Sequence, residues 1–330
     1  MSTSQDPSSP PKIKKVTLLG ANGKLGLAVL HALLSANFTV QILKRTSSTS
    51  PDDDFPPGIT IHRISDDFPI SDLVPVLRGQ DALVATIKGS QVEIQRRLAD
   101  ACVQAGVYRF IPADFGSCDS SSALTQDLVP LYKRKTELRE YLQGLVARED
   151  EKGNEGRFTW TSVVCGHFFD WQASFIHVWP GERRAEILSD PEDVKVAGKW
   201  RASFCTLARV GEATARLLLY PDVGVNKMVF VQSFCVTQKE VVEAFQRVSG
   251  REWDVRILDS EKFRKEEERK RDEGGKQAVE ELVWWLGTVG AEWTKRGDFV
   301  NAALRLEDEG LNEVVGRVLR EDEEERRGGK

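Results

Sequence analysis

Three glycines lie at a spacing that suits a bound phosphate group. Residues 20–26 read G-A-N-G-K-L-G, and they separate a short apolar run from a stretch with helical periodicity. In this setting the first glycine permits a tight turn, the second lets backbone N–H groups approach a pyrophosphate, and the third lets the helix pack close to the sheet. The helix N-terminus then attracts the anion through unpaired N–H groups and the helix dipole. Glycines also mark turns without a ligand, but the strand before and the helix after favour a dinucleotide site. The predicted binding residues are Gly20, Ala21, Asn22, Gly23, Lys24, Leu25 and Gly26.

The residues after the second apolar run indicate which dinucleotide would bind. Residues 38–43 are followed by Lys44 and Arg45, and no acidic residue occurs before Asp52. A site for NAD usually ends this strand with an Asp or Glu that binds the ribose 2′-OH. Two cations suit a 2′-phosphate instead, and Arg45 could hold it with two parallel hydrogen bonds. The alternative is that both cations are ordinary exposed charges. The pattern favours NADP(H) over NAD(H).

Polar residues also follow three other apolar runs. In an open α/β sheet the ligand lies beyond the carboxyl ends of the strands, so the candidate segments are 88–89 (K-G), 113–116 (A-D-F-G) and 166–169 (G-H-F-F). The Tyr-x-x-x-Lys pair of ordinary short-chain dehydrogenases is not formed, because Tyr132 has Thr136 at the fourth place. That difference argues against the usual tyrosine-based mechanism. It also weakens an epimerase or dehydratase assignment, which would use the same pair.

Alternating strand and helix patterns must position these residues. Apolar, β-branched runs occur at 14–19, 38–43, 58–64, 81–87, 108–112 and 158–165. Helical periodicity separates several of them, most clearly at 92–105, which Gly106 ends, and at 131–146. Such alternation predicts βαβ units with right-handed crossovers. The expected fold is therefore α/β, with a doubly wound parallel sheet of the NAD(P)-binding Rossmann kind.

The C-terminal half follows a looser pattern. It has helix-like stretches at 210–219 and 239–248 and strand-like ones at 227–232 and 252–258. From Glu261 the chain is highly charged but keeps apolar positions, as solvated helices do. We expect residues 307–330 to form a frayed or disordered tail. The predicted organisation is a disordered leader at 1–12, a Rossmann domain at 13–170, and a smaller α/β substrate-binding subdomain with charged helices at 171–330.

Composition narrows the possible functions. The 330-residue chain is 40% hydrophobic and 29% charged, and its formal net charge of −5 argues against nucleic acid as a main partner. Its five cysteines are far apart without a C-x-x-C pair, and no two of its four histidines have helical ligand spacing, so we expect reduced thiols and no metal site. The Ser/Pro-rich start lacks an apolar signal segment, and no apolar run reaches about 18 residues. We therefore predict a soluble, cytoplasmic protein without membrane contact.

Several motifs together resemble the NmrA-like, isoflavone-reductase-like family of atypical short-chain dehydrogenases. Residues 20–26 resemble its cofactor loop, and Arg45 with Ser48 resembles the R-x-x-S that follows its second strand. The segment 109–116 (R-F-I-P-A-D-F-G), with Gln95 and residues 99–106 before it, resembles the most specific family signature. Two departures occur there, because Ala113 stands for Ser and Asp114 for Glu. They concern substrate detail more than family membership.

Two later segments extend the resemblance to about residues 14–260. Residues 130–142 resemble the family's lysine-bearing helix, and residues 158–168 resemble the element beside the nicotinamide. By this resemblance Lys135 is the catalytic lysine, whose ammonium would anchor the nicotinamide ribose and stabilise charge on a substrate oxygen, or whose amine would act as a general base. Lys133 would face another side of the helix, and we favour Lys135. The resemblance also implies cofactor contacts at Ile87 and Lys88 and a substrate pocket at Phe115, His167 and Phe168.

The resemblance implies an NADPH-dependent reductase of a small phenolic, quinone-like or polyketide-derived compound, with a role in secondary metabolism. The expected partners are this substrate and NADPH, and the expected state is a monomer or homodimer. A non-catalytic NADP(H)-sensing regulatory protein is the alternative, because the same family includes such sensors. Lys135 favours the enzyme, since a sensor needs no positioned proton-transfer group.

Overall fold

The computed structural model describes residues 10–154, 157–190, 192 and 196–328. They form two compact units that interleave along the chain. The first unit comprises the described parts of Met1–Asp114, Arg134–Val163 and Gly211–Val229, and the second those of Phe115–Lys133, Val164–Val210 and Phe230–Lys330. The predicted domains at 13–170 and 171–330 are a different grouping and stay a prediction. Residues 1–9 of the predicted leader lie outside the described residues.

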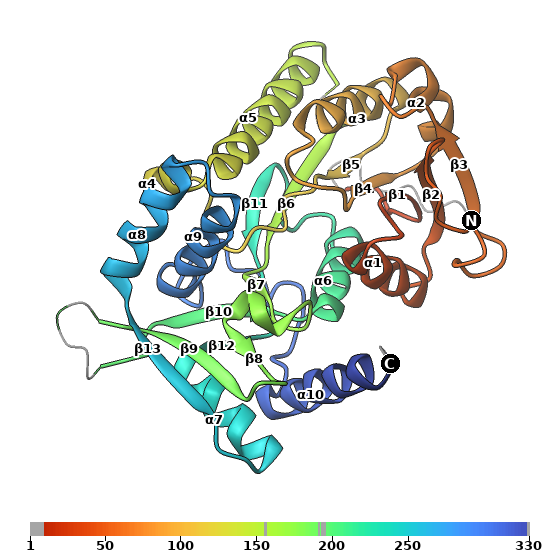
Figure 1. Cartoon of the computed structure of the whole chain (residues 1–330). Coiled ribbons are helices and arrows are strands. Elements are labelled where there is room, and N and C mark those ends of the chain that lie inside the picture. The colour runs from red at the N-terminus through yellow and green to blue at the C-terminus, as the bar shows by residue number, and fades with distance from the viewer. Residues whose placement is uncertain (1–9, 155–156, 191, 193–195, 329–330) are drawn as a thin grey trace. The chain divides into compact units, whose positions relative to one another are not determined.

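The first unit is built on a seven-stranded sheet with the order β11-β6-β5-β4-β1-β2-β3 (Figure 1). Its strands are β1 (Lys15–Leu19), β2 (Thr39–Arg45), β3 (Thr60–Ile64), β4 (Ala82–Ala85), β5 (Arg109–Ile111), β6 (Thr159–Val164) and β11 (Lys227–Phe230). The flanking helices are α1 (Lys24–Ser35), α2 (Ile70–Leu77), α3 (Val92–Ala105), α5 (Pro130–Glu151) and α6 (Leu207–Leu219). The pairs from β3 through β1 to β6 are parallel, which confirms the predicted doubly wound Rossmann-type sheet.

The strand order reverses at β1, which lies between β2 and β4. Leu19, the last residue of β1, is level with Leu43 of β2 and Ala85 of β4. The carboxyl ends of the three strands therefore meet at one edge of the sheet. In doubly wound folds a ligand binds at this switch point. The segments that follow these strands begin at Gly20, Thr46 and Thr86, so the topology brings the predicted cofactor segments together.

Burial explains why the elements around this edge form. All of β1 after Lys15 is buried, and α1 turns a stripe of apolar residues spaced by three and four, such as Val29 and Leu33, toward the core. Helix α3 ends at Gly106, whose φ of +76° is the left-handed conformation that favours glycine at a helix end. Helix α2 was not predicted from the sequence, because it is only eight residues long and contains Pro75.

The second unit contains two three-stranded sheets, with the orders β12-β10-β7 and β13-β9-β8. Their strands are β7 (His167–Phe168), β8 (Val178–Trp179), β9 (Arg184–Ser189), β10 (Arg201–Cys205), β12 (Phe234–Thr237) and β13 (Asp254–Asp259). Its helices are α4 (Ala123–Leu128), the 3₁₀ helix η1 (Ala173–Ile176), α7 (Gln238–Ser249), α8 (Ser260–Asp272), α9 (Lys276–Val289) and α10 (Leu311–Gly328). Among the described helices, none has both the length and the apolar composition that a membrane span requires.

The expectation of a disordered tail at 307–330 is wrong for most of its described part. Helix α10 spans Leu311–Gly328 and packs against α7. It buries Val314, Val315 and Val318, which share one face because they are one, three and four positions apart. A stripe this short is hard to recognise in the sequence, because most residues around it are charged.

Candidate active site

The first and third glycines of the 20–26 turn are required by close backbone contacts. Gly20 has a φ of +90°, and a Cβ added there would lie 2.8 Å from the carbonyl oxygen of Thr86. A Cβ on Gly26 would lie 2.0 Å from the carbonyl oxygen of Gly20. A Cβ on Gly23 would meet only that oxygen, at 3.6 Å, so the exposed middle of the turn has room for a ligand.

The start of α1 has the properties of an anion site. Among the described side chains, none caps this helix N-terminus, and its first turn contains no acidic residue. Its uncapped N–H groups therefore remain available to an anion. The side-chain amide nitrogen of Asn22 is buried and has no hydrogen-bond partner among the described residues. A buried donor without an acceptor is costly, so this geometry fits the pyrophosphate of a dinucleotide.

The last two residues of β2, Lys44 and Arg45, have different surroundings. Lys44 is buried, and its Nζ lies 2.5 Å from the carboxylate of Asp52 and donates a hydrogen bond to the carbonyl of Ser50. The interpretation of Lys44 as a phosphate ligand is therefore not supported, because its charge is used to hold the 50–52 loop. The Arg45 side chain is 53% exposed and lies only at the limit of an ion pair, 4.0 Å from Asp66. Of the two cations, Arg45 is the one placed to meet a phosphate.

Asp66 organises the Arg45–Ser48 turn and was not recognised in the sequence. Its carboxylate accepts hydrogen bonds from the backbone N–H and hydroxyl of Ser47 and from the hydroxyl of Thr46. The hydrogen bonds from Ser47 and Thr46 outweigh the effect of burial and lower the pKa of Asp66. The hydroxyl of Ser48 lies 2.9 Å from that of Ser50. Asp66 could have been recognised by its position just after β3, the strand that pairs with the one that carries Arg45.

Lys135 is buried at the carboxyl end of β5, whereas Lys133 of the same helix is exposed. The Nζ of Lys135 donates a hydrogen bond to the main-chain carbonyl of Asp114 and lies 3.3 Å from its Oδ1. The loop after β4 approaches closely, since a Cβ on Gly89 would lie 3.1 Å from the Cε of Lys135. In that loop Ile87 is half-buried and Lys88 is exposed. The helix thus presents one lysine to the sheet edge.

Two further buried side chains share the Asp114 carboxylate with Lys135, and the sequence analysis missed both. Arg139 donates from Nη1 to Oδ2 of Asp114 at 2.6 Å, and the hydroxyl of Ser162 on β6 donates to the same oxygen. Burial alone would raise the pKa of Asp114, but the charges of Lys135 and Arg139 and the Ser162 hydrogen bond outweigh it and hold the pKa below its usual value. The signal for Arg139 was its place one helical turn after Lys135.

The turn that carries Asp114 is held in a strained conformation. The side-chain oxygen of Gln95 on α3 accepts a hydrogen bond from the N–H of Ala113 at 2.7 Å. Phe115 follows with a φ of +38°, which is unusual for a residue other than glycine. Strain of this kind persists only where the surrounding structure imposes it, and it is common at functional sites.

The residues expected to line a substrate pocket lie in the second unit. Phe115 is buried, and Phe168 is half-buried with its ring 5.3 Å from that of Trp171. His167 lies in β7 and is level with Phe204 of β10. Burial lowers the pKa of His167 to about 4, so its imidazole is neutral near neutral pH. A lining role for these residues stays a prediction.

The model of the NmrA-like family matches residues 12–294. The chain belongs to the NmrA-like family. The match continues beyond residue 260, where the sequence motifs ended, and includes α8 and α9. Two fungal relatives are 30% identical to the chain. One is the oxidoreductase aprR of Aspergillus flavus, over 93% of this chain and 99% of that protein, and the other is the oxidoreductase poxI of Penicillium oxalicum, over 92% and 94%.

Solved structures of similar fold include two reductases. An isoflavone reductase is 19% identical, with a TM-score of 0.71 over 92% of this chain and 99% of that protein. The binary complex of leucoanthocyanidin reductase with NADPH from Vitis vinifera has the same identity, coverage and TM-score. The likeness agrees with the Rossmann-type sheet of the NmrA-like chain.

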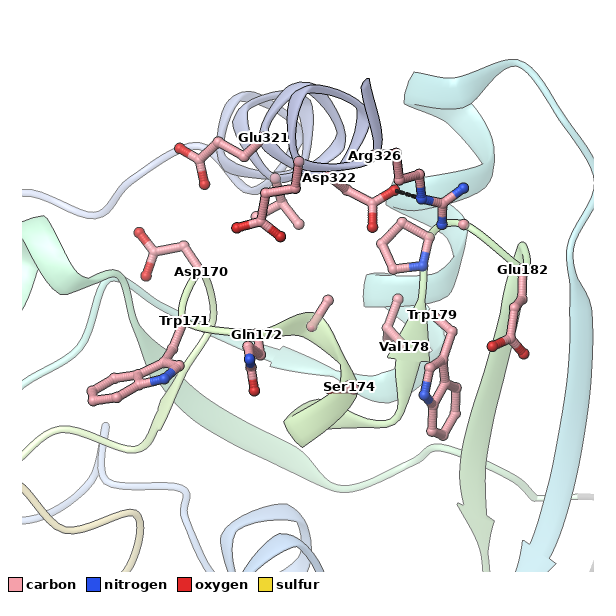
Figure 2. Close-up of a pocket in the computed structure, with 15 residues that line it drawn as sticks. Asp170, Trp171, Gln172, Ser174, Val178, Trp179, Glu182, Glu321, Asp322 and Arg326 are labelled. Carbon is pink, nitrogen blue, oxygen red and sulfur yellow. Dashed lines mark ion pairs between the residues drawn. The ribbon is translucent and has the colours of Figure 1, made fainter. Parts of the chain in front are cut away.

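The second unit of this NmrA-like protein also contains an acidic pocket of about 320 Å³ (Figure 2). Two indoles, those of Trp171 and Trp179, line it together with carboxylates from two segments. The acidic lining residues are Asp170, Glu182, Glu321, Asp322 and Glu325, and the basic one is Arg326. Burial, opposed by a hydrogen bond from the Leu207 N–H, raises the pKa of Asp170, and the charges of Glu321 and Glu309 raise it further. This surplus of negative charge disfavours an anionic ligand.

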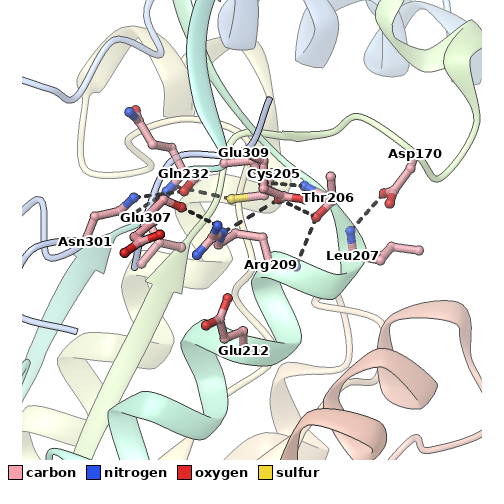
Figure 3. Close-up of polar contacts among 12 residues, drawn as sticks. Asp170, Cys205, Thr206, Leu207, Arg209, Glu212, Gln232, Asn301, Glu307 and Glu309 are labelled. Atoms are coloured by element: carbon pink, nitrogen blue, oxygen red, sulfur yellow. Dashed lines mark hydrogen bonds and ion pairs between the residues drawn. The ribbon is translucent and has the colours of Figure 1, made fainter. Parts of the chain in front are cut away.

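A polar cluster fixes the segment before α10 to the start of α6 (Figure 3). The carboxylate of Glu309 accepts hydrogen bonds from the hydroxyls of Thr206 and Ser233 and lies 3.7 Å from Nε of Arg209. The Thr206 hydroxyl in turn accepts from the backbone N–H of Arg209, and Asp170 accepts from that of Leu207. These bonds satisfy backbone donors at the helix start, so we interpret the cluster as structural.

Proposed function

We propose that the protein is an NADPH-dependent reductase of a small phenolic, quinone-like or polyketide-derived compound. The observation that carries the proposal is the buried Lys135, held beside Asp114 at the sheet edge in the unit that contains the glycine turn. The relatives that are named oxidoreductases support redox activity. The structural neighbour that binds NADPH supports the choice of cofactor.

The residues of the first unit fit NADPH in three places. The glycine turn and the uncapped start of α1, with Asn22, would hold the pyrophosphate. Arg45 and Ser48 would hold the 2′-phosphate, with Asp66 ordering their turn. Ile87 and Lys88 would border the cofactor along the loop after β4. The cofactor, when bound, supplies the hydride.

Lys135 would act on the substrate through the positive charge of its ammonium group, which is held in a fixed position. Its Nζ is fixed by the carbonyl and carboxylate of Asp114, so little reorganisation is needed when charge develops on a nearby oxygen. A carbonyl, quinone or phenol oxygen gains negative charge or exchanges a proton during reduction, which is why these substrates suit an ammonium group. A fixed donor of this kind contributes about 10²–10³-fold to turnover in other enzymes.

Binding and turnover of the purified protein test this proposal. We expect fluorescence titration to show tighter binding of NADPH than of NADH, and a panel of quinone-like and phenolic acceptors to include at least one that consumes NADPH. Equal affinity for NADPH and NADH would contradict the role of Arg45. Tight binding of NADP(H) without turnover on any acceptor would favour the non-catalytic sensor.

A further inference from the structure

We propose that Arg139 and Asp114 are positioning residues for Lys135. By binding one oxygen of the Asp114 carboxylate, Arg139 would leave the other oxygen and the main-chain carbonyl of Asp114 to hold the lysine ammonium. This inference rests on the proposed function, because it concerns how the lysine of that site is kept in place.

The contacts divide the Asp114 carboxylate into two halves. Oδ2 accepts hydrogen bonds from Arg139, at 2.6 Å, and from the hydroxyl of Ser162. Oδ1 is buried, has no hydrogen-bond partner among the described residues, and lies 3.3 Å from the Nζ of Lys135. The two hydrogen bonds to Oδ2 therefore fix the orientation of the Asp114 carboxylate. The ammonium of Lys135 donates a hydrogen bond to the main-chain carbonyl of Asp114 and lies near the negative charge of Oδ1. The hydrogen bonds that Arg139 and Ser162 donate go to the other carboxylate oxygen, Oδ2.

Helix α5 places the two cations side by side. Lys135 and Arg139 are one turn apart and are 7% and 8% exposed, whereas Glu137 between them is exposed. A long cationic side chain is rarely this buried without a partner. The guanidinium also donates to the hydroxyl of Thr136 at 2.9 Å, which fixes its plane. Arg139 is thus held by the same helix that carries the lysine.

The charges around Asp114 explain why a second cation would be needed. Two cations, from α5, face one carboxylate, from the turn after β5, while Gly89 after β4 and Ser162 on β6 contribute no charge. Without Arg139 the carboxylate would be drawn fully to Lys135. The ammonium would then be displaced toward Asp114 and stabilised there, which reduces its effect on a substrate oxygen. An arginine suits this place because its guanidinium stays charged when it is buried.

The first test compares Arg139→Gln and Arg139→Lys with the matched control Arg134→Gln, which changes an exposed arginine of the same helix. We expect Arg139→Gln to lower kcat by about 10- to 100-fold, as loss of a supporting partner does around other sites. The KM and the affinity for NADPH should change little in comparison, whereas the melting temperature should fall, because a buried ion pair loses one partner. Arg139→Lys should recover most of kcat, because it restores the charge. Wild-type kcat in a folded Arg139→Gln protein would overturn the proposal, and so would an Arg139→Lys protein that binds NADPH but is no more active.

The second test measures Lys135 without relying on turnover. An amine-selective reagent is allowed to react with the protein at a series of pH values, and peptide mass mapping gives the rate at which Lys135 is labelled. The pH dependence of this rate reports the pH at which the Lys135 ammonium loses a proton. We expect this midpoint to rise by about one pH unit in Arg139→Gln and to fall in Asp114→Asn. If Arg139→Gln does not fold, Ser162→Ala removes the other donor to Oδ2 and should raise the midpoint by less.

The two tests separate this inference from the proposed function. Shifted midpoints in a protein that reduces no acceptor would support the positioning role and contradict the reductase. Turnover by the wild-type protein, with midpoints that stay the same in both Arg139→Gln and Asp114→Asn, would support the reductase and overturn the positioning role.

Discussion

The imidazole of His177 lies flat on the indole of Trp284, with the ring centroids 3.5 Å apart and the planes inclined by 6°. Each imidazole nitrogen also faces a carboxylate. Nδ1 lies 3.0 Å from Glu186 on β9, and Nε2 lies 2.8 Å from Glu281 on α9. Carboxylates only accept hydrogen bonds, so both nitrogens must be protonated for both bonds to form. The geometry therefore describes an imidazolium that ties β9 to α9 within the second unit.

This arrangement predicts a pH-dependent stability. Burial lowers the pKa of His177, but the hydrogen bonds and charges of Glu186 and Glu281 outweigh it, so the pKa is raised above its ordinary value of 6.5. Because its pKa is higher in the folded state, the protonated His177 raises the free energy of unfolding, and this contribution is complete below about pH 6.5. It is lost as the pH rises through the folded-state pKa. Each unit by which the folded-state pKa exceeds the unfolded-state pKa adds about 1.4 kcal/mol to the free energy of unfolding.

Denaturant unfolding at a series of pH values checks this prediction. We expect the free energy of unfolding to fall above about pH 6.5 in the wild-type protein and the fall to be smaller in His177→Gln. His31→Gln, at an exposed histidine of α1, is the control and should keep the wild-type profile. Identical profiles for wild type and His177→Gln would show that the imidazolium does not contribute.

The glycine turn predicts different outcomes for two alanine substitutions. Gly26→Ala should destabilise the first unit and abolish cofactor binding, because its Cβ would lie 2.0 Å from a backbone oxygen. Gly23→Ala should fold normally, since its nearest neighbour would be 3.6 Å away, yet bind NADPH more weakly because the methyl occupies the open face of the turn. Melting curves and NADPH titration distinguish the two. Unchanged NADPH affinity in Gly23→Ala would place the cofactor elsewhere.

Arg45 should determine the preference for a 2′-phosphate. Arg45→Ala should weaken NADPH binding by about tenfold, the value of one charge-assisted hydrogen bond at an exposed site. The affinity for NADH should stay the same, since NADH lacks the phosphate. Arg78→Ala provides a control, because Arg78 is an exposed arginine at the C-terminal end of α2 in the same unit. A parallel loss of affinity for both dinucleotides would mean that Arg45 acts on the fold of the loop.

The buried face of α10 should contribute to stability. Val315 is fully buried, so Val315→Ala should cost about 1–3 kcal/mol through lost burial and an unfilled cavity. Asn312→Ala on the exposed side of the same helix should change the free energy of unfolding by less than about 0.5 kcal/mol. Equal effects from the two substitutions would argue against a packed C-terminal helix.

The sequence predicted the first unit well, because its signals are local. An apolar run before a glycine turn, a helical stripe after it, and Gly106 at a helix end each specify their own conformation. In the second unit the same reasoning predicted α7 and β13, but it missed short strands such as β7 and β8, which have two residues each. A two-residue strand has no period to recognise, and its pairing depends on partners that are distant along the chain.

The residues of the candidate site could also be predicted only where the sequence signal is local. Glycine spacing and the position of Lys135 could be read locally, but Arg139, Ser162 and Asp66 could not. Ser162 and Asp114 are 48 positions apart, and Asp66 and Ser47 are 19 apart. Only the parallel sheet brings such residues together. The role of Lys44 was misjudged for a related reason, since its ion pair with Asp52 depends on how the loop folds back.

The most direct test of the central claim compares Lys135→Met with Lys133→Met. Methionine keeps much of the length of lysine and removes the charge, and Lys133 is the exposed lysine of the same helix. Our account predicts that Lys135→Met binds NADPH about as well as the wild type and loses about 10²–10³-fold in turnover, while Lys133→Met keeps both. Unchanged turnover in Lys135→Met would contradict the assignment of Lys135 as the catalytic residue.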